Sequence, residues 1–259
     1  MNSVAAPVIP RLEHTGRVTQ ARVVLSEWTK LRSVRSTLWS LGVAVLLTVG
    51  LPLLIATIRT TRAHPDRHGP SPLEIASAGV NISQLAIAVL GVLLITGEYS
   101  TGMIRATFTA VPTRLPVLWA KIGIYAVVSF VLMLPCVVIG FFGSQAILAH
   151  KNLGQISFSH PGVARTVIGG AVYLMLIGVF ALALGAIVRS TAGGISAFAA
   201  IFFVIPPLLN ILPSSWNNAI APWIPDSAAR AIFQLTHDAH SLSPAGGLAI
   251  FLAYIAAAV

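Results

Sequence analysis

Two short groups of residues carry side chains that could bind a metal ion. Each group has two histidines and one aspartate: His64, Asp66 and His68 in the first, and His237, Asp238 and His240 in the second. Imidazole and carboxylate groups are common zinc ligands, but a closed zinc site takes four ligands. Each group offers too few, and each lies in a predicted loop of a kind that often contains such residues. We therefore assign no metal ligand.

The motifs of several common enzyme sites are absent from the sequence. It has no G-x-x-x-x-G-K-[ST] phosphate loop, no H-E-x-x-H zinc pair and no G-x-S-x-G nucleophile turn. We therefore expect no catalytic site and no cofactor bound by this chain, so that any ATP would be used by a partner. Asn81, Ser83 and Gln84 are the nearest candidates for chemistry inside a membrane. Hydrogen bonding between helices explains them more simply.

A charged, amphipathic segment, GEYSTGMIRATFTAVPTRLPVLWAK, runs from Gly97 to Lys121. Glu98 is expected just after an apolar run, where its carboxylate would favour the N-terminus of a helix predicted from about Tyr99 to Ala110. The apolar side of this helix would be Met103, Ile104, Phe108 and Val111, its polar side Arg105 and Thr109, and its end Pro112. Such a helix, held against a membrane face, could receive force from a soluble partner. An ordinary interfacial loop fits the pattern equally well.

The composition requires these residues to be carried by membrane-spanning elements. Hydrophobic residues make up 56% of the 259, charged residues only 9%, and the mean hydropathy is +0.87. A soluble domain usually has about a quarter of its residues charged, so lipid must be part of the solvent here. The net charge of +9 would suggest nucleic acid in a soluble protein. Here the basic residues flank apolar runs, which indicates anionic lipid and no nucleic acid.

The predicted fold class is an all-α integral membrane protein with six transmembrane helices. We place the spans at about 38–58, 75–96, 117–142, 163–188, 194–212 and 244–259. Most approach the roughly 20 residues needed to cross a bilayer, and the third is expected to break near Pro135. The last would reach only about 24 Å, against a hydrocarbon core of about 30 Å, so we expect it to be cut short. Before it, a short interfacial helix is predicted from Asp226 to Leu235, capped by Asp226.

The spans form one transmembrane domain over residues 18–259, preceded by a mobile cytoplasmic tail over residues 1–17. Apolar residues at spacings of three and four from Val24 predict an amphipathic helix that leads into the first span. Its interfacial residues would be Trp28, Lys30, Arg32 and Arg35. The alternative is that these are simply the solvated first turns of a longer helix. Basic residues near the first span favour a cytoplasmic N-terminus, whereas Lys121 and Arg165 are expected to snorkel at span ends.

The chain resembles the permease subunits of the type-2 ABC transporter family over essentially its whole length. Three strings carry the resemblance: SEWTKLRSVRSTLWSL, GEYSTGMIRATFTAVPTR and GVFALALGAIVRSTAGGIS. The first is similar to the elbow helix of that family, and the second to the cytoplasmic coupling helix between spans two and three, which docks onto a separate ATPase subunit. The ATPase-coupling residues implied by the resemblance are Glu98, Tyr99, Gly102, Ile104 and Arg105, with Pro112 and Arg114 closing the segment.

The resemblance implies two permease copies and two ATPase subunits in a bacterial plasma membrane. ATP would be used by the ATPase subunits, and the cargo of the exporter would be a hydrophobic or amphipathic drug, antibiotic, peptide or lipid. Gly169, Gly170, Gly178 and Gly185 in the fourth span would allow helices to pack closely. The alternative function is a non-transporting membrane protein, such as an immunity or sensor-associated subunit that binds an antimicrobial without ATP.

Overall fold

The computed structural model describes residues 25–29, 32, 35–61, 69–100, 114–151, 153–235 and 241–259. All regular secondary structure in these ranges is helical, as the sequence predicts. Five helices of the described part are long and apolar enough to cross a membrane, and a sixth apolar helix, at the C-terminal end, is shorter. The chain is thus an all-helical, multi-pass membrane protein.

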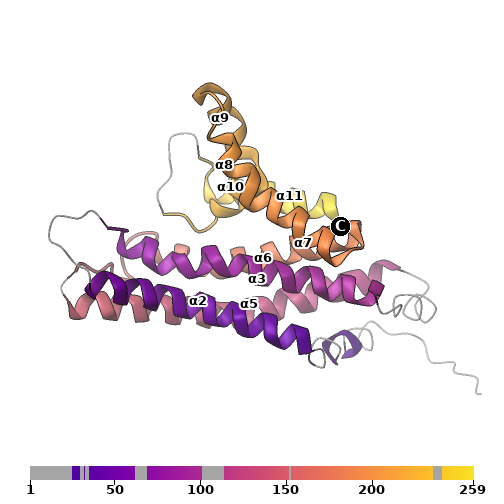
Figure 1. The fold of residues 1–259 in the computed structure, drawn as a ribbon, viewed down its shortest axis with the longest axis horizontal. Helices are drawn as coiled ribbons and strands as arrows, with labels where there is room; N and C mark the ends of the chain where they lie inside the picture. Colours follow the sequence, from indigo (N-terminus) through magenta and orange to yellow (C-terminus); the bar gives the residue numbers. More distant parts are fainter. Residues whose placement is uncertain are drawn as a thin grey trace, which may run out of the picture.

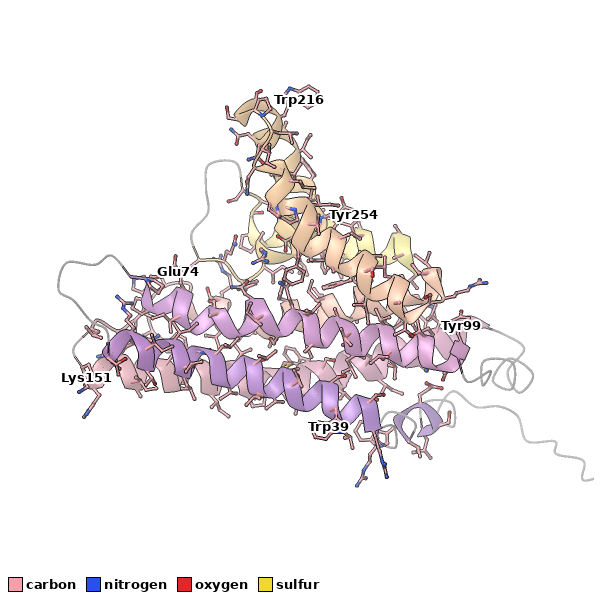
Figure 2. All side chains as sticks on the ribbon, in the orientation of Figure 1. Trp39, Glu74, Tyr99, Lys151, Trp216 and Tyr254 are labelled. Carbon is pink, nitrogen blue, oxygen red and sulfur yellow. The ribbon has the colours of Figure 1, made fainter. Side chains whose placement is uncertain are left out.

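Four long helices form a bundle in which they lie side by side along their length (Figure 1). They are α2 (Arg35–Thr61), α3 (Pro72–Ser100), α5 (Arg114–His150) and α6 (Val163–Val188). Helices suit such apolar sequences because each satisfies its backbone hydrogen bonds internally, which lipid cannot do for it. Figure 2 labels Tyr99 near one end of α3 and Glu74 near the other. We call these two ends of the bundle the Tyr99 end and the Glu74 end.

The bundle helices differ from the predicted spans chiefly in α5 and α3, and α5 extends to His150, well beyond the predicted end of the third span at 142. Helix α5 runs unbroken through Pro135, so the predicted break is wrong. A proline lacks only one backbone donor, and neighbouring helices in a membrane often compensate for it. Helix α3 continues to Ser100, so that Glu98 lies inside this helix rather than just after it. The predicted fourth span, by contrast, coincides with α6.

Glycines allow α3, α5 and α6 to approach one another closely. A Cβ atom added to Gly91 would lie 2.3 Å from the carbonyl oxygen of Gly178, and one added to Gly178 would lie 2.1 Å from the hydroxyl of Tyr125. That hydroxyl donates a hydrogen bond to the carbonyl of Ile87 at 2.8 Å. Because a side chain at these glycines would force the backbones apart, the close packing predicted for Gly178 is confirmed.

The chain leaves the bundle obliquely after α6, as Figure 1 shows. The fifth apolar segment consists of α7 (Thr191–Ala199), a π-helical turn η1 (Ala200–Val204) and α8 (Ile205–Leu209). The irregular turn ends two residues before Pro206, and neither Pro206 nor Pro207 can donate a backbone hydrogen bond. The fifth predicted span, 194–212, therefore corresponds to a continuous helical stretch of 19 residues, Thr191–Leu209, that contains one π-helical turn.

The rest of the chain returns toward the bundle through short helices. These are α9 (Ser214–Ile220), the 3-10 turn η2 (Ala221–Trp223), α10 (Pro225–Arg230) and α11 (Pro244–Ala258), and α11 packs against α10 and α6. The predicted helix from Asp226 to Leu235 is wrong in its bounds and its cap. Asp226 lies in the first turn of α10 and bonds to Arg230 instead of capping. We call residues 191–259 the C-terminal arm.

Candidate functional site

Three charged side chains meet inside the Tyr99 end of the bundle. The ammonium group of Lys121 donates a hydrogen bond to Oε1 of Glu98 at 3.0 Å and another to Oε2 of Glu27. The side chains of Lys121, Glu27 and Glu98 are only 2%, 4% and 10% exposed. We call these residues the ion cluster.

The topology of the chain explains why these residues meet. Glu98 lies in the last turn of α3, and Lys121 lies about two turns into α5, so antiparallel packing of the two helices brings them level. Glu27 comes from the helical residues 25–29 that precede α2. The ion cluster therefore joins a segment near the N-terminus to both helices that flank residues 101–113.

Because the ion cluster is buried, its stability depends on the presence of all three charged side chains. Charges removed from water lose several kcal/mol of hydration, which their mutual attraction recovers only when every partner is in place. Snorkelling, which the sequence suggests for Lys121, is wrong, because its ammonium group points into the bundle and is enclosed by two carboxylates. An enclosed group of this kind can fix the relative positions of three segments.

Further contacts join the same end of α3 to the junction of α6 and α7. The guanidinium carbon of Arg189 lies 6.0 Å from the centroid of the Tyr99 ring, a cation–π distance. Arg189 adopts a left-handed conformation with φ 54°, which ends α6, and Ser190 then caps α7. The hydroxyl of Thr191 donates to that of Thr96 at 2.8 Å. The end of α3 is thus held from two sides.

The structure describes only part of the predicted coupling segment and N-terminal helix. Glu98 and Tyr99 lie at the end of α3, and α5 begins at Arg114, whose side chain lies outside the described part. Trp28, Arg32 and Arg35 are exposed, and their predicted interfacial role stays a prediction. The predicted residues that lie outside the described part are Lys30, Gly102, Ile104, Arg105 and Pro112, together with both histidine groups.

Trp28 contributes to an apolar groove on the outside of the bundle. The groove has a volume of about 480 Å³ and includes Trp119, Gly123 and Val127 of α5. Indole rings favour the boundary between lipid tails and headgroups, so this groove fits a lipid-facing surface near the Tyr99 end. Within the described residues, no group of three His, Cys, Asp or Glu side chains is arranged to hold a metal ion.

A second buried ion pair lies where the C-terminal arm meets the bundle. Nε of Arg230 donates to both carboxylate oxygens of Asp226, at 2.8 and 2.9 Å, and Nη1 donates to Oδ1 of Asn81 on α3 at 2.7 Å. Burial raises the pKa of the Asp226 carboxyl, while the adjacent Arg230 charge partly opposes this rise. Nearby, the hydroxyl of Tyr173 donates to Oε1 of Gln84. Hydrogen bonding between elements, expected for Asn81 and Gln84, is confirmed.

The sequence reasoning missed Glu27, Lys121, Asp226 and Arg230 as functional candidates. The signal that could have found them is the scarcity of acidic residues, of which the chain has only seven. Of the four that the structure describes, three bond to basic side chains and Glu74 forms a reciprocal cap with Ser71 at the start of α3. In so apolar a chain, each acidic residue needs a defined partner.

Comparison with protein-family models and with curated protein sequences finds no match to this chain.

Proposed function

We propose that this chain is the membrane-spanning permease subunit of an ATP-driven ABC exporter. A separate ATPase subunit would bind and hydrolyse ATP, and a second permease copy would complete the path for a hydrophobic or amphipathic substrate. The chain itself would catalyse no reaction and bind no cofactor. Its resemblance to the type-2 permease family and its set of apolar spans support this proposal.

The observation that carries the proposal is the position of the ion cluster. Residues 97–114 resemble the coupling helix, and Glu98 within this segment bonds to Lys121, seven residues beyond its end, at 3.0 Å. Lys121 also bonds to Glu27, in the segment that resembles the elbow helix. A partner that pushed on residues 101–113 would therefore move α3, α5 and the N-terminal segment together. Transport driven by a soluble ATPase needs such a connection.

We place the Tyr99 end of the bundle at the cytoplasmic face of a bacterial plasma membrane. The basic residues before α2 support this orientation under the positive-inside rule. The single cysteine, Cys136, is buried, so a cysteine introduced elsewhere can be labelled selectively. In intact cells, an impermeant maleimide should label Ser159→Cys, in an exposed loop at the Glu74 end, but not Trp28→Cys. The reverse pattern would invert the orientation.

The function is tested by co-purification with an ATPase subunit encoded beside this chain. We expect the ATPase to bind the wild-type chain and to be released by Arg105→Glu and by Glu98→Lys. Arg165→Glu is the matched control, because Arg165 is exposed near the other end of the bundle. Since Glu98 is buried next to Lys121, its reversal tests the ion cluster, whereas Arg105→Glu tests the docking segment itself.

Two results would contradict the proposal in different ways. If the ATPase bound all the variants equally, residues 97–114 would not be the docking segment. If no ATPase bound the wild-type chain, the alternative of a non-transporting, ligand-binding membrane protein would be favoured. A resistance phenotype that survives inactivation of the ATPase would also favour that alternative.

A further inference from the structure

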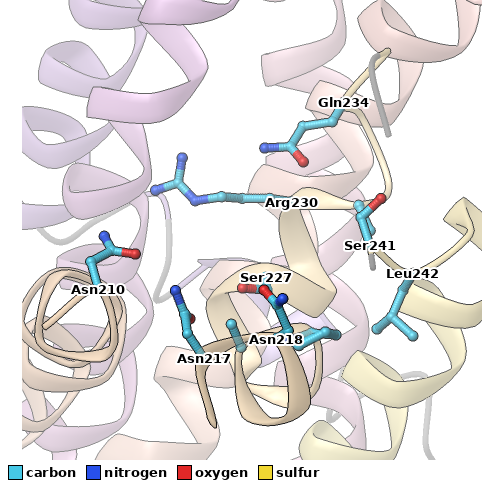
Figure 3. Close-up of a pocket in the computed structure, with 11 residues that line it drawn as sticks. Asn210, Asn217, Asn218, Ser227, Arg230, Gln234, Ser241 and Leu242 are labelled. Carbon is cyan, nitrogen blue, oxygen red and sulfur yellow. The ribbon is translucent and has the colours of Figure 1, made fainter. Parts of the chain in front are cut away.

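A polar cavity of about 420 Å³ lies within the C-terminal arm, between α8 and α9 on one side and α10 on the other. Figure 3 shows side chains from these separate elements around a common space. The polar side chains that line it include Asn210, Asn217, Asn218, Ser227, Arg230 and Gln234. Among the lining residues in the described part of the chain there is one cation and no carboxylate.

Arg230 is held rigidly at the edge of this cavity. The Nε atom of Arg230 donates to the carboxylate of Asp226, which is only 7% exposed, and Nη1 donates to Asn81. The Arg230 side chain remains 26% exposed. Within the described residues, Nη2 of Arg230 makes no hydrogen bond. A guanidinium fixed on one side and open on the other is arranged to bind an oxygen anion, since little conformational freedom remains to be lost.

The position of Arg230 along the bundle corresponds to the depth of lipid tails when α3 is taken as centred in the bilayer. Helix α3 has 29 residues, so it is about 43 Å long and exceeds a hydrocarbon core of about 30 Å. Asn81 lies about 14 Å from the start of α3, which is roughly 7 Å inside that core if α3 is centred. Charged groups at such depth usually mark a functional site rather than a lipid-facing surface.

The helix α9 also carries apolar side chains that do not line the cavity. Trp216 and Ile220 are 63% and 39% exposed, and in the sequence of α9 they flank the lining residues Asn217 and Asn218. Figure 2 places Trp216 at the far tip of the arm. A ligand that fills this site would therefore meet amides and a cation inside and apolar rings outside, which is the pattern of an amphipathic molecule.

We propose that this cavity binds the anionic oxygen head group of an amphipathic molecule, with Arg230 as the charged anchor and the asparagine amides of α8 and α9 as hydrogen-bond donors. The tail would lie along the apolar side of α9. Binding does not depend on the proposed transport function, although the identification of the ligand as cargo would rest on it. The site can therefore be tested on the purified chain without an ATPase.

The experiment is native mass spectrometry of the purified chain in dodecyl maltoside, titrated with dodecyl phosphate. The double variant Asp226→Asn/Arg230→Gln removes both charges together, so no buried charge is left without its partner. We expect it to weaken dodecyl phosphate binding by about tenfold or more, the usual loss for a charged hydrogen bond. Lys151→Gln, which removes an exposed cation at the Glu74 end, should leave binding unchanged.

A second variant controls for misfolding of the double variant. Asn217→Leu changes the opposite wall without touching the ion pair, and it should weaken binding severalfold while leaving gel-filtration behaviour unchanged. Inorganic phosphate is titrated in parallel, and we expect it to bind much more weakly than dodecyl phosphate. Equal binding of the two would overturn the amphipathic ligand in favour of a simple anion site. Dodecyl phosphate binding that neither variant weakens would overturn the site itself.

Discussion

The four-helix bundle and the C-terminal arm enclose their charges to different degrees. In the bundle, Lys121 is 2% exposed and has two carboxylate partners, whereas in the arm Arg230 is 26% exposed, has one carboxylate partner and borders a cavity. An enclosed charge can only position the segments around it. A charge with one open side can also bind a ligand, so the two regions are suited to different tasks.

The two regions also differ in how closely their residues pack. Gly91 in the bundle has no room for a Cβ atom, and the apolar core of the bundle continues into the arm through Phe202, Ala228 and Phe251, whereas α8, α9 and η2 in the outer part of the arm have no buried residue. Close packing spreads the cost of moving one helix over its neighbours, and sparse packing allows a segment to open alone. We therefore expect changes in the bundle to lower global stability, and changes in the outer part of the arm to act locally.

The largest effect is expected for Lys121→Met. This change leaves Glu27 and Glu98 buried without the lysine, and breaking a buried ion pair typically costs about 3–5 kcal/mol of unfolding free energy. Thermal unfolding of the purified protein in detergent measures it, with Lys151→Met as an exposed control. Replacing both glutamates by glutamine in the Lys121→Met background should recover most of the loss. Equal melting temperatures for Lys121→Met and the wild type would show that the ion cluster has no structural role.

Gly91→Ala should have the next largest effect, because the new methyl group would lie 2.3 Å from the Gly178 carbonyl oxygen. Separating α3 from α6 to remove this clash should cost about 1–3 kcal/mol. Gly123→Ala is the matched control, since a Cβ at Gly123 meets nothing within 4 Å, and alanine should even stabilise that helix slightly. If both variants melted alike, close packing would not distinguish the bundle.

Asp226→Asn tests the ion pair of the arm through its pH dependence. Because burial raises the pKa of Asp226, the folded state takes up a proton more readily than the unfolded state. The wild type should therefore gain stability relative to Asp226→Asn as the pH falls from neutral toward the unfolded pKa near 3.8, below which the gain is complete. Melting temperatures of both proteins across this range measure the difference. A relative loss for the wild type on acidification would mean that the Arg230 charge dominates.

Much of the bundle could be predicted from the sequence because apolar runs in lipid have few alternatives to a helix. The range 163–188 coincides with α6, and α2 and α3 extend only a few residues beyond the predicted spans. The break predicted at Pro135 is wrong, because the helix-breaking effect of proline in water is weaker in a membrane helix supported by its neighbours. The π-helical turn of the fifth span at Ala200–Val204 has no local signal beyond the two prolines that follow.

The candidate sites could not be predicted because their residues are distant in sequence. Glu27 and Lys121 are separated by 94 residues, and Asn81 and Arg230 by 149. Local patterns assigned Lys121 to snorkelling and Asp226 to a helix cap, because both rules consider only neighbours along the chain. Only packing of the helices shows that a side chain near a span end turns inward to meet a partner.

The smallest effects are expected for the removal of two helix caps. Because one cap lies in the bundle and the other in the arm, the two variants compare the regions directly. Ser71 caps α3 in the bundle and Ser243 caps α11 in the arm, each accepting a backbone hydrogen bond, at 3.2 and 3.1 Å. Removing either cap by substitution with alanine should cost about 1 kcal/mol. Ser71→Ala should lower the melting temperature of the whole protein. Ser243→Ala should instead raise hydrogen–deuterium exchange within α11 alone, since an arm that opens locally need not unfold the bundle. If Ser243→Ala lowered the global melting temperature as much as Ser71→Ala does, the arm and the bundle would unfold as one unit, and the two regions would not differ in local stability.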